Sequence, residues 1–381
     1  MIRAQGAARL TRAYTSSARP VPLLPKTLAE SSKPPGHIPV FRTLAALRRW
    51  RRDARDRDLD VGCVPTMGAL HEGHLSLVKT SLKRHPFTVM TLFVNPMQFA
   101  PHEDLSAYPR TFERDMDSLR SLLPTGPESP IHGLGISEYD GRPSPRSQRQ
   151  AADSPLVVFA PTADVMYPLR GELQDMSRRK GASIEVRGWG EVMEGASRPQ
   201  FFTGVATVVT KLFNAVEPDH AYFGQKDIQQ ALLLKIMLTD LLVSHPTSDN
   251  LHILPTRRDP ETGLALSSRN AYLSPAEKKV APTLARALEA GRAAWSSGAT
   301  GEAIIEAATA VVKAEEERLK TSGEDVDLRL DYFEVFEKDT FTPVRGVPAT
   351  GQLAIAGAMF VGKTRLIDNL LLGWEAEEAE D

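Results

Sequence analysis

Residues 65–77, PTMGALHEGHLSL, decide the fold of this chain. The apolar run before them, residues 59–64, predicts a buried strand. After them, apolar residues recur at helical spacing, which predicts a helix that begins near Gly73. Gly68 and Gly73 let the chain between the two elements turn sharply and approach a ligand closely. A strand, a glycine loop and a helix start present free backbone N–H groups to an anion.

Two histidines of this stretch, His71 and His74, lie three residues apart and share one face of a first helical turn. Imidazoles at a helix N-terminus suit a polyphosphate whose leaving group gains negative charge. A surface turn with two solvated histidines is the alternative that this stretch alone leaves open. A zinc-peptidase site is rejected, because H-E-x-x-H needs one more residue between its histidines.

Composition excludes several classes of protein. The chain has 381 residues, enough for two domains, with 41% hydrophobic and 25% charged residues, as in a soluble globular protein. Its 46 Lys and Arg against 48 Asp and Glu give a net charge of −2, so no basic field argues for nucleic acid. No apolar run reaches the roughly 20 residues of a membrane span. The single cysteine, Cys63, excludes an internal disulfide and a multi-cysteine zinc site.

The first 36 residues indicate a leader rather than a folded element. Residues 1–33 carry four arginines and no acid before Glu30, which is the composition of a mitochondrial transit peptide. A disordered, mildly basic tail on a cytoplasmic protein is the alternative. Residues 31–39 are rich in proline and predict a linker.

The next segments alternate between helix and strand. Residues 43–57 predict a helix with Leu44, Leu47 and Trp50 on its apolar face and a run of arginines on a solvated face. Residues 87–94 predict a strand that ends where Pro96 stops regular structure. Gln98 lies just beyond it, where parallel sheets bind ligands, so it is a candidate substrate contact. Residues 124–155, rich in Pro, Ser, Gly and Arg, predict a disordered insertion.

A second informative stretch lies between residues 207 and 242. It predicts a helix over 207–216, a strand over 220–223, a turn over 224–227 and a helix over 228–242. The last helix offers Leu232, Leu233, Ile236 and Leu241 to a core. Lys226 places a cation in the turn, where a phosphate fits. Gln230 lies three residues after Asp227 and shares its helical face.

The third informative stretch, residues 251–270, predicts a strand, a turn and a tight loop. Ser267, Ser268 and Arg269 put two hydroxyls and a guanidinium in that loop, where they can hold a phosphate by charge-assisted hydrogen bonds.

Together these elements predict an α/β fold with a doubly wound parallel sheet over residues 37–256. Strands over 156–160 and 182–187 add to that sheet. Helices over 275–297 and 300–321, then strands over 328–336 and 353–360, predict a smaller C-terminal α+β domain over 257–381. The Ser267–Arg269 loop falls at the junction, so we expect the smaller domain to close as a lid.

Residues 357–364, GAMFVGKT, match the P-loop pattern letter for letter. A P-loop opens a large parallel sheet whose later strands supply a second acidic motif. The chain ends at residue 381, too soon for that sheet, so we reject a P-loop here.

Six motifs stand in one order along the chain: PTMGALHEGH, FVNPMQF, YPRT, GVATVVTKLFN, FGQKDIQQ and LALSSRNAYLS. Together they closely resemble the pantoate–β-alanine ligase family, from about residue 40 to the end apart from the insertion. The resemblance implies a Rossmann-like fold of the HIGH-motif nucleotidyltransferases. It also implies a two-step reaction: ATP and (R)-pantoate give pantoyl adenylate and pyrophosphate with Mg²⁺, and β-alanine then displaces AMP to give pantothenate.

The resemblance also implies site residues. His71 and His74 would stabilise the transition state, with His74 as the acid, and Lys226 would reach the phosphates. Gln98 and Gln230 would bind pantoate or β-alanine. The ATP-binding residues implied are Met67, Gly68, Ala69, Leu70, His71, Glu72, Gly73, His74, Gly224, Gln225, Lys226, Asp227, Arg257, Leu266, Ser267, Ser268 and Arg269.

One departure concerns the metal. Relatives often carry adjacent acids after YPRT, whereas Arg114 precedes Asp115 here, so Asp115 alone is left as a protein ligand to Mg²⁺. Family members are typically homodimers, which the resemblance extends to this chain. Two other functions stay open at this point: a P-loop NTPase that depends on Lys363, and a relative that binds nucleotide without turnover.

Overall fold

The computed structural model describes residues 37–101, 103, 105–123, 137–139, 154–169, 171–348 and 351–379. The predicted leader, and the predicted insertion apart from residues 137–139 and 154–155, lie outside these residues. The larger sheet has seven strands in the order β4-β1-β5-β3-β2-β6-β7, and every neighbouring pair is parallel. These strands are β1 (Pro39–Phe41), β2 (Val61–Thr66), β3 (Phe87–Leu92), β4 (Ser137–Tyr139), β5 (Leu156–Phe159), β6 (His220–Gly224) and β7 (Leu251–Leu254).

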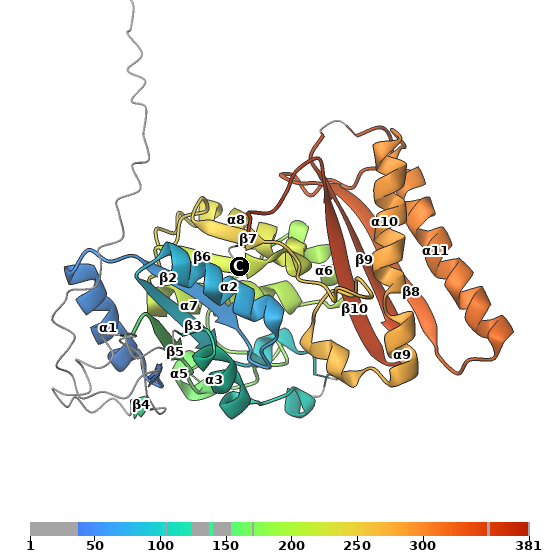
Figure 1. Cartoon of the computed structure of the whole chain (residues 1–381). Coiled ribbons are helices and arrows are strands. Elements are labelled where there is room, and N and C mark those ends of the chain that lie inside the picture. Colours follow the sequence, from blue (N-terminus) through green and yellow to red (C-terminus); the bar gives the residue numbers. More distant parts are fainter. Residues whose placement is uncertain are drawn as a thin grey trace, which may run out of the picture. The chain divides into compact units, whose positions relative to one another are not determined.

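Both faces of this sheet are buried, which confirms the doubly wound prediction. Alternate strand residues enter two different cores: Cys63 and Val157 one, Val64 and Val158 the other. The first core is closed by α1 (Leu44–Asp56), α7 (Phe201–Val216) and α8 (Ile228–Asp240). The second is closed by α2 (Glu72–Arg84) and α3 (Phe112–Arg120). Figure 1 shows the strands between these helices.

The order of the strands places a ligand site at the end of β2. From β2 the chain continues to β3 on one side, and β6 joins the other side much later. Parallel sheets bind ligands at such a switch, beyond the carboxyl ends of the strands. The loops after β2 and β6 therefore meet at one edge.

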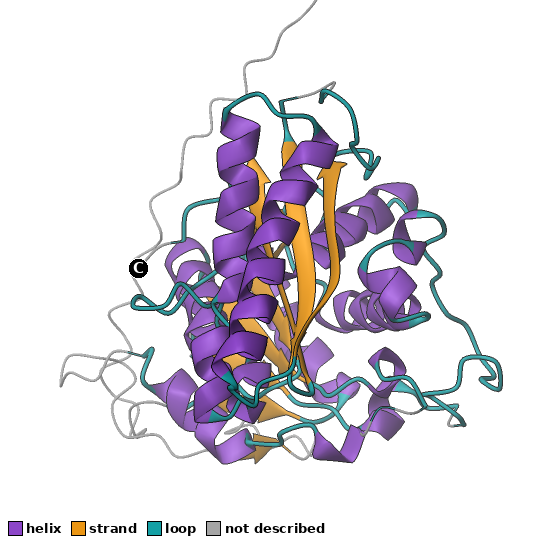
Figure 2. Ribbon diagram, turned by 90° about the vertical axis from the view of Figure 1, so that its right-hand side faces the viewer, coloured by secondary structure: helices purple, strands orange, loops and turns teal. Residues whose placement is uncertain are grey.

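The second sheet is antiparallel, in the order β10-β9-β8, with β8 (Leu328–Glu337), β9 (Leu353–Val361) and β10 (Thr364–Leu372). The helices α10 (Thr283–Ser296) and α11 (Gly301–Ser322) lie against it (Figure 2) and share its core. The helix predicted over 275–297 is interrupted: α9 (Pro275–Val280) ends before Pro282, which is the N-cap of α10. The boundary at residue 256 stays a prediction.

The short elements complete the described chain: α5 (Ala163–Met166), α6 (Glu194–Ser197), and the 3₁₀ turns η2 (Pro96–Gln98), η3 (Leu105–Ala107), η4 (Trp189–Glu191), η5 (Gln225–Asp227) and η6 (Ser268–Tyr272). No described helix combines the length and the apolar character that a bilayer crossing needs.

Three local predictions were wrong. Residues 182–187 form no strand, because Ile184 donates its N–H to Thr207 Oγ1 of α7 instead of to a neighbouring strand. Leu241 lies just past α8 and is 45% exposed. Residues 137–139 of the predicted disordered insertion form β4, which pairs with β1.

The structure also corrects the predicted solvated face of α1. Arg51 is 3% exposed, and its guanidinium donates to the Glu217 carbonyl at 2.9 Å and to Asp219 Oδ2 at 3.0 Å. Asp219 Oδ2 also accepts the Val61 N–H at 2.8 Å. One arginine thus connects α1, the C-terminal end of α7 and the first residue of β2.

Arg51→Ala is expected to lower the free energy of unfolding by about 2–3 kcal/mol, because it leaves Asp219 and the Glu217 carbonyl without their cation. Denaturant unfolding measures this difference. Arg52→Ala removes the exposed neighbour on the same helix and is the control. Equal stability of the two variants would contradict a structural role for Arg51.

Candidate functional site

The loop after β2 connects the strand to α2 as the sequence predicted. His71 precedes the helix, and its Nδ1 accepts the Gly73 N–H at 3.2 Å, so the histidine caps α2. Gly68 and Ala69 have φ angles of 83° and 52°, in the left-handed region. Alanine adopts that region at a cost, so other contacts must hold it there.

Those contacts come from Asp115 of α3. Its Oδ2 accepts the Ala69 N–H at 3.0 Å, and its Oδ1 accepts the Leu70 N–H at 2.9 Å. The Thr111 hydroxyl adds a third hydrogen bond at 3.1 Å, and Asp115 is only 3% exposed. Both oxygens of Asp115 thus hold the loop in shape, and its predicted role as a magnesium ligand stays a prediction.

The two histidines form a close pair, with ring centroids 4.0 Å apart. Burial and the Lys226 ammonium lower the pKa of His71 to about 4. The pKa of His74 is lowered well below its ordinary value by burial, by His71 and by Lys226. Both imidazoles are therefore neutral at neutral pH, and the role of His74 as the acid stays a prediction. A neutral imidazole still donates one N–H.

The Nδ1 atoms of the two histidines differ in their hydrogen-bond partners. His71 Nδ1 accepts a backbone N–H, so the neutral ring carries its proton on Nε2. His74 Nδ1 is buried and has no hydrogen-bond partner among the residues that the structure describes. A buried polar atom without a partner is costly and indicates a group that a ligand completes.

The second motif meets the first across the sheet. Strand β6 is paired to β2, and η5 follows it directly, so Lys226 comes to the edge that carries His71. Lys226 Nζ lies 3.3 Å from Asp227 Oδ1, and its side chain is 16% exposed. Its effect on the pKa of both histidines places its charge beside them.

The third motif forms η6. Ser267 caps it, with its Oγ accepting the Arg269 N–H at 3.3 Å. Ser268 hydrogen-bonds the Tyr108 side chain, although burial dominates and raises the pKa of that phenol. The Tyr272 hydroxyl donates to the Ala107 carbonyl at 3.3 Å. The serine loop thus lies against the YPRT segment. Leu266 begins this loop, and its N–H donates to the Arg257 carbonyl at 2.9 Å.

Sequence reasoning missed two residues that join these motifs, Asp368 and Asn369 of β10. Asn369 Nδ2 donates to the Gln225 carbonyl at 2.8 Å and to the Lys226 carbonyl at 3.0 Å. Asp368, 3% exposed, accepts two hydrogen bonds from Arg258, at 2.5 and 2.9 Å. The sequence does signal these two residues, because they form a polar pair within the largely apolar residues 364–372.

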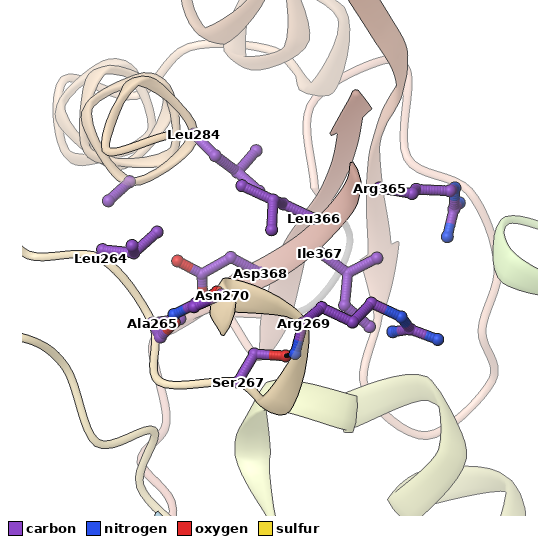
Figure 3. Close-up of a pocket in the computed structure, with 11 residues that line it drawn as sticks. Leu264, Ala265, Ser267, Arg269, Asn270, Leu284, Arg365, Leu366, Ile367 and Asp368 are labelled. Carbon is purple, nitrogen blue, oxygen red and sulfur yellow. Dashed lines mark hydrogen bonds between the residues drawn. The ribbon is translucent and has the colours of Figure 1, made fainter. Parts of the chain in front are cut away.

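Two cavities flank this strand. One, of about 10 Å³, is lined by Ser267, Arg269 and Asp368 among others, as Figure 3 shows. The other, of about 30 Å³, is lined by Lys226, Asp227 and Gln230 together with Asp368. Ligand sites usually measure some 300–1,000 Å³. Both cavities are smaller than that, and neither is lined by His71 or His74.

The two predicted glutamines lie in different surroundings. Gln98 ends η2, and its Oε1 accepts from Asn95 Nδ2 at 3.0 Å. Asn95 is buried, and its Oδ1 accepts a hydrogen bond from the Tyr167 hydroxyl at 2.6 Å. These hydrogen bonds hold the side chains around Gln98 in place. Gln230 lines the cavity beside Lys226. No hydrogen bond in the described part of the chain joins the two glutamines.

The P-loop match is a β-hairpin. Residues 357–361 belong to β9, Gly362 and Lys363 form the turn, and Thr364 begins β10. A phosphate-binding P-loop instead leads from a strand into a helix. The rejection of this motif is therefore confirmed.

Comparisons with known proteins agree with the six motifs. A family model described as pantoate-beta-alanine ligase matches residues 39–371. A pantothenate synthetase of Moorella thermoacetica is 40% identical over 333 residues, covering 87% of this chain and 98% of that protein. The crystal structure of pantothenate synthetase from Thermus thermophilus has a TM-score of 0.65 at 36% identity, covering 87% of this chain and 99% of that one. A pantoate-beta-alanine ligase from Francisella tularensis, solved with "Beta-gamma ATP" and beta-alanine, has a TM-score of 0.59 at 25% identity, covering 88% and 97%.

Asp115→Asn is expected to lower the free energy of unfolding by about 1–3 kcal/mol, because an amide NH₂ then faces a buried backbone donor. Chemical denaturation measures this loss. Asp117→Asn, at an exposed acid of the same helix, is the matched control. A metal ligand would behave differently: Asp115→Asn would leave stability unchanged and alter only the magnesium dependence of any reaction.

Proposed function

The chain belongs to the pantoate–β-alanine ligase family, and from this premise we propose which of its residues carry each step. It is an ATP-dependent ligase of the Rossmann-like class, which joins pantoate to β-alanine. The observation that carries the proposed site is the convergence of Lys226 with His71 and the unpartnered His74 at the carboxyl ends of β2 and β6.

In the first step a carboxylate oxygen of (R)-pantoate attacks the α-phosphorus of ATP. The bond to the bridging oxygen breaks, and pyrophosphate leaves with the electron pair. The carboxylate is already a nucleophile, so no protein base is needed. His71 and His74 donate neutral N–H groups to the phosphoryl oxygens, while Lys226 neutralises the charge that develops.

Residues 267–269 hold the β- and γ-phosphates. Two hydroxyls and a guanidinium there give charge-assisted hydrogen bonds to the leaving pyrophosphate. The loop of residues 67–74 and residues 224–227 surround the nucleotide, and Arg257 and Leu266 border it. Gln98 and Gln230 position pantoate through its hydroxyl and carboxylate groups.

In the second step the β-alanine amine attacks the acyl carbon of the adenylate. The amide bond forms, AMP leaves with the bond's electrons, and the amine loses a proton. Mg²⁺ would enter with ATP and would neutralise phosphate charge. Asp115 is committed to the loop, so we assign the metal to the phosphates and to no protein ligand.

We further propose that the chain acts as a homodimer in mitochondria. Family members are typically homodimers, which supports the dimer. The arginine-rich, acid-poor residues 1–33 support the mitochondrial location. A monomer mass by light scattering, or a cytoplasmic location of the tagged full chain, would remove the respective proposal.

Lys226→Ala is expected to reduce pantoate-dependent ATP–pyrophosphate exchange, without β-alanine, on the order of 100-fold or more. His74→Ala is expected to act in the same direction, because it removes a phosphate donor. Lys363→Ala, at the exposed hairpin lysine, is the control and should retain full exchange.

The reverse pattern, with activity lost in Lys363→Ala and kept in Lys226→Ala, would identify a P-loop enzyme. A folded wild-type chain that binds ATP but shows no exchange would be a binding protein. Either result would contradict the proposed function.

ATP binding is expected to take up protons below neutral pH. The pKa of His71 is about 4 in the structure, and a bound polyphosphate raises it towards the ordinary value near 6.5. Between these two values the complex holds more protons than the free protein, so affinity rises as pH falls through that window. Calorimetry in two buffers of different ionisation enthalpy measures the uptake. Uptake that persists unchanged in His71→Asn would contradict this assignment.

A further inference from the structure

A cluster of histidines lies at the opposite edge of the sheet from the proposed site. Asp60 precedes β2, His220 begins β6, and His85 follows the last residue of α2. The reaction proposed above uses the carboxyl ends of β2 and β6, whereas this cluster lies at their amino ends. It is therefore a separate place on the molecule with no part in that chemistry.

The three side chains are arranged as metal ligands. Asp60, His85 and His220 each offer one ligand atom, and these atoms lie within 4.8 Å of one another. The His85 and His220 rings are stacked, with centroids 4.3 Å apart. Around a tetrahedral zinc ion the ligand atoms stand roughly 3.3 Å apart, given bonds of about 2.0–2.1 Å. The exposed Asp60 side chain can move toward the two histidines.

The second nitrogen of each ligand histidine is already hydrogen-bonded. His85 Nε2 lies 2.6 Å from the Tyr222 hydroxyl, and His220 Nδ1 lies 2.9 Å from His252 Nε2. This leaves His85 Nδ1 and His220 Nε2 as the ligand atoms. Metal-bound histidines almost always donate their other N–H to such a partner, which fixes the tautomer and the ring orientation.

The tautomer of His220 is determined by a relay that ends at a carboxylate. His252 Nδ1 lies 2.8 Å from Glu377, so it carries the proton that it donates. With the neutral tautomer His252 Nε2 is an acceptor, and His220 Nδ1 donates to it. His220 Nε2 then keeps its lone pair. Arg84, whose charge acts on both histidines, pairs with Glu377 at 3.0 Å, which offsets that charge.

We propose that Asp60, His85 and His220 bind a divalent transition-metal ion of the zinc class, with water in the fourth position. Two imidazoles and a carboxylate favour zinc over magnesium, which prefers oxygen ligands. The ion would join the C-terminal end of α2 to the starts of β2 and β6. The same helix carries His71 and His74 at its other end, so the ion would brace the element that presents them.

The full-length chain, stripped with a chelator and dialysed against Zn²⁺, is expected to hold one zinc ion by elemental analysis. Asp60→Asn should weaken Zn²⁺ binding at least tenfold by calorimetric titration, and His220→Gln should do the same. Glu377→Gln, which acts through His252 and through the charge of Arg84, should weaken it by about 10–100-fold. Asp58→Asn, at a nearby exposed acid, should bind zinc like the wild type.

Asp60 is exposed, so Asp60→Asn keeps the test valid even if His220→Gln fails to fold. Thermal unfolding gives a second readout: Zn²⁺ should raise the Tm of the wild type and of Asp58→Asn, but not of Asp60→Asn. Absence of bound zinc in the wild type would overturn the proposal. So would zinc that stays in Asp60→Asn and is lost in His71→Ala, because the ion would then belong to the nucleotide site.

Discussion

One buried carboxylate holds the loop on which the proposed chemistry depends. Asp115 accepts the N–H groups of two consecutive residues, Ala69 and Leu70, and it fixes a non-glycine residue in the left-handed region. That shape delivers the chain to His71 at the angle needed to cap α2. With a neutral or absent side chain at position 115 the loop would lose its anchor, and the histidines would lose their common orientation.

Strand β10 holds the turn at residues 224–227 and the serine loop in place, as Asp115 holds the loop before α2. Asn369 satisfies two carbonyls of η5, and Asp368 binds Arg258 at the base of the serine loop. These bonds connect the antiparallel sheet to the parallel one at the site itself. They also explain why both cavities are small: the polar groups that a nucleotide would meet are partly satisfied by β10.

The sequence was sufficient where the information is local. The strand, glycine loop and helix around residues 65–77 and the turn at residues 224–227 follow from spacing and residue type. It was insufficient where the partner is distant. The residues around Arg51 do not indicate that it pairs with Asp219, which lies 168 residues further along the chain. The residues around Asp115 likewise do not indicate that it accepts the N–H of Leu70. The exposed Leu241 and the missing strand at residues 182–187 show the same limit, because periodicity does not say which neighbour a segment finds.

The small cavities beside β10 also bear on how this ligase could be inhibited. A compound that widens either cavity must separate β10 from its neighbours, and part of its binding energy is lost in doing so. A compound that contacts Lys226 and Gln230 of the second cavity while leaving the Asn369 hydrogen bonds in place would incur no such loss. It would occupy the space beside Lys226, and it would need no adenine ring. Selectivity against other ATP-using enzymes would then come from β10, which belongs to this fold, rather than from the nucleotide, which they all share.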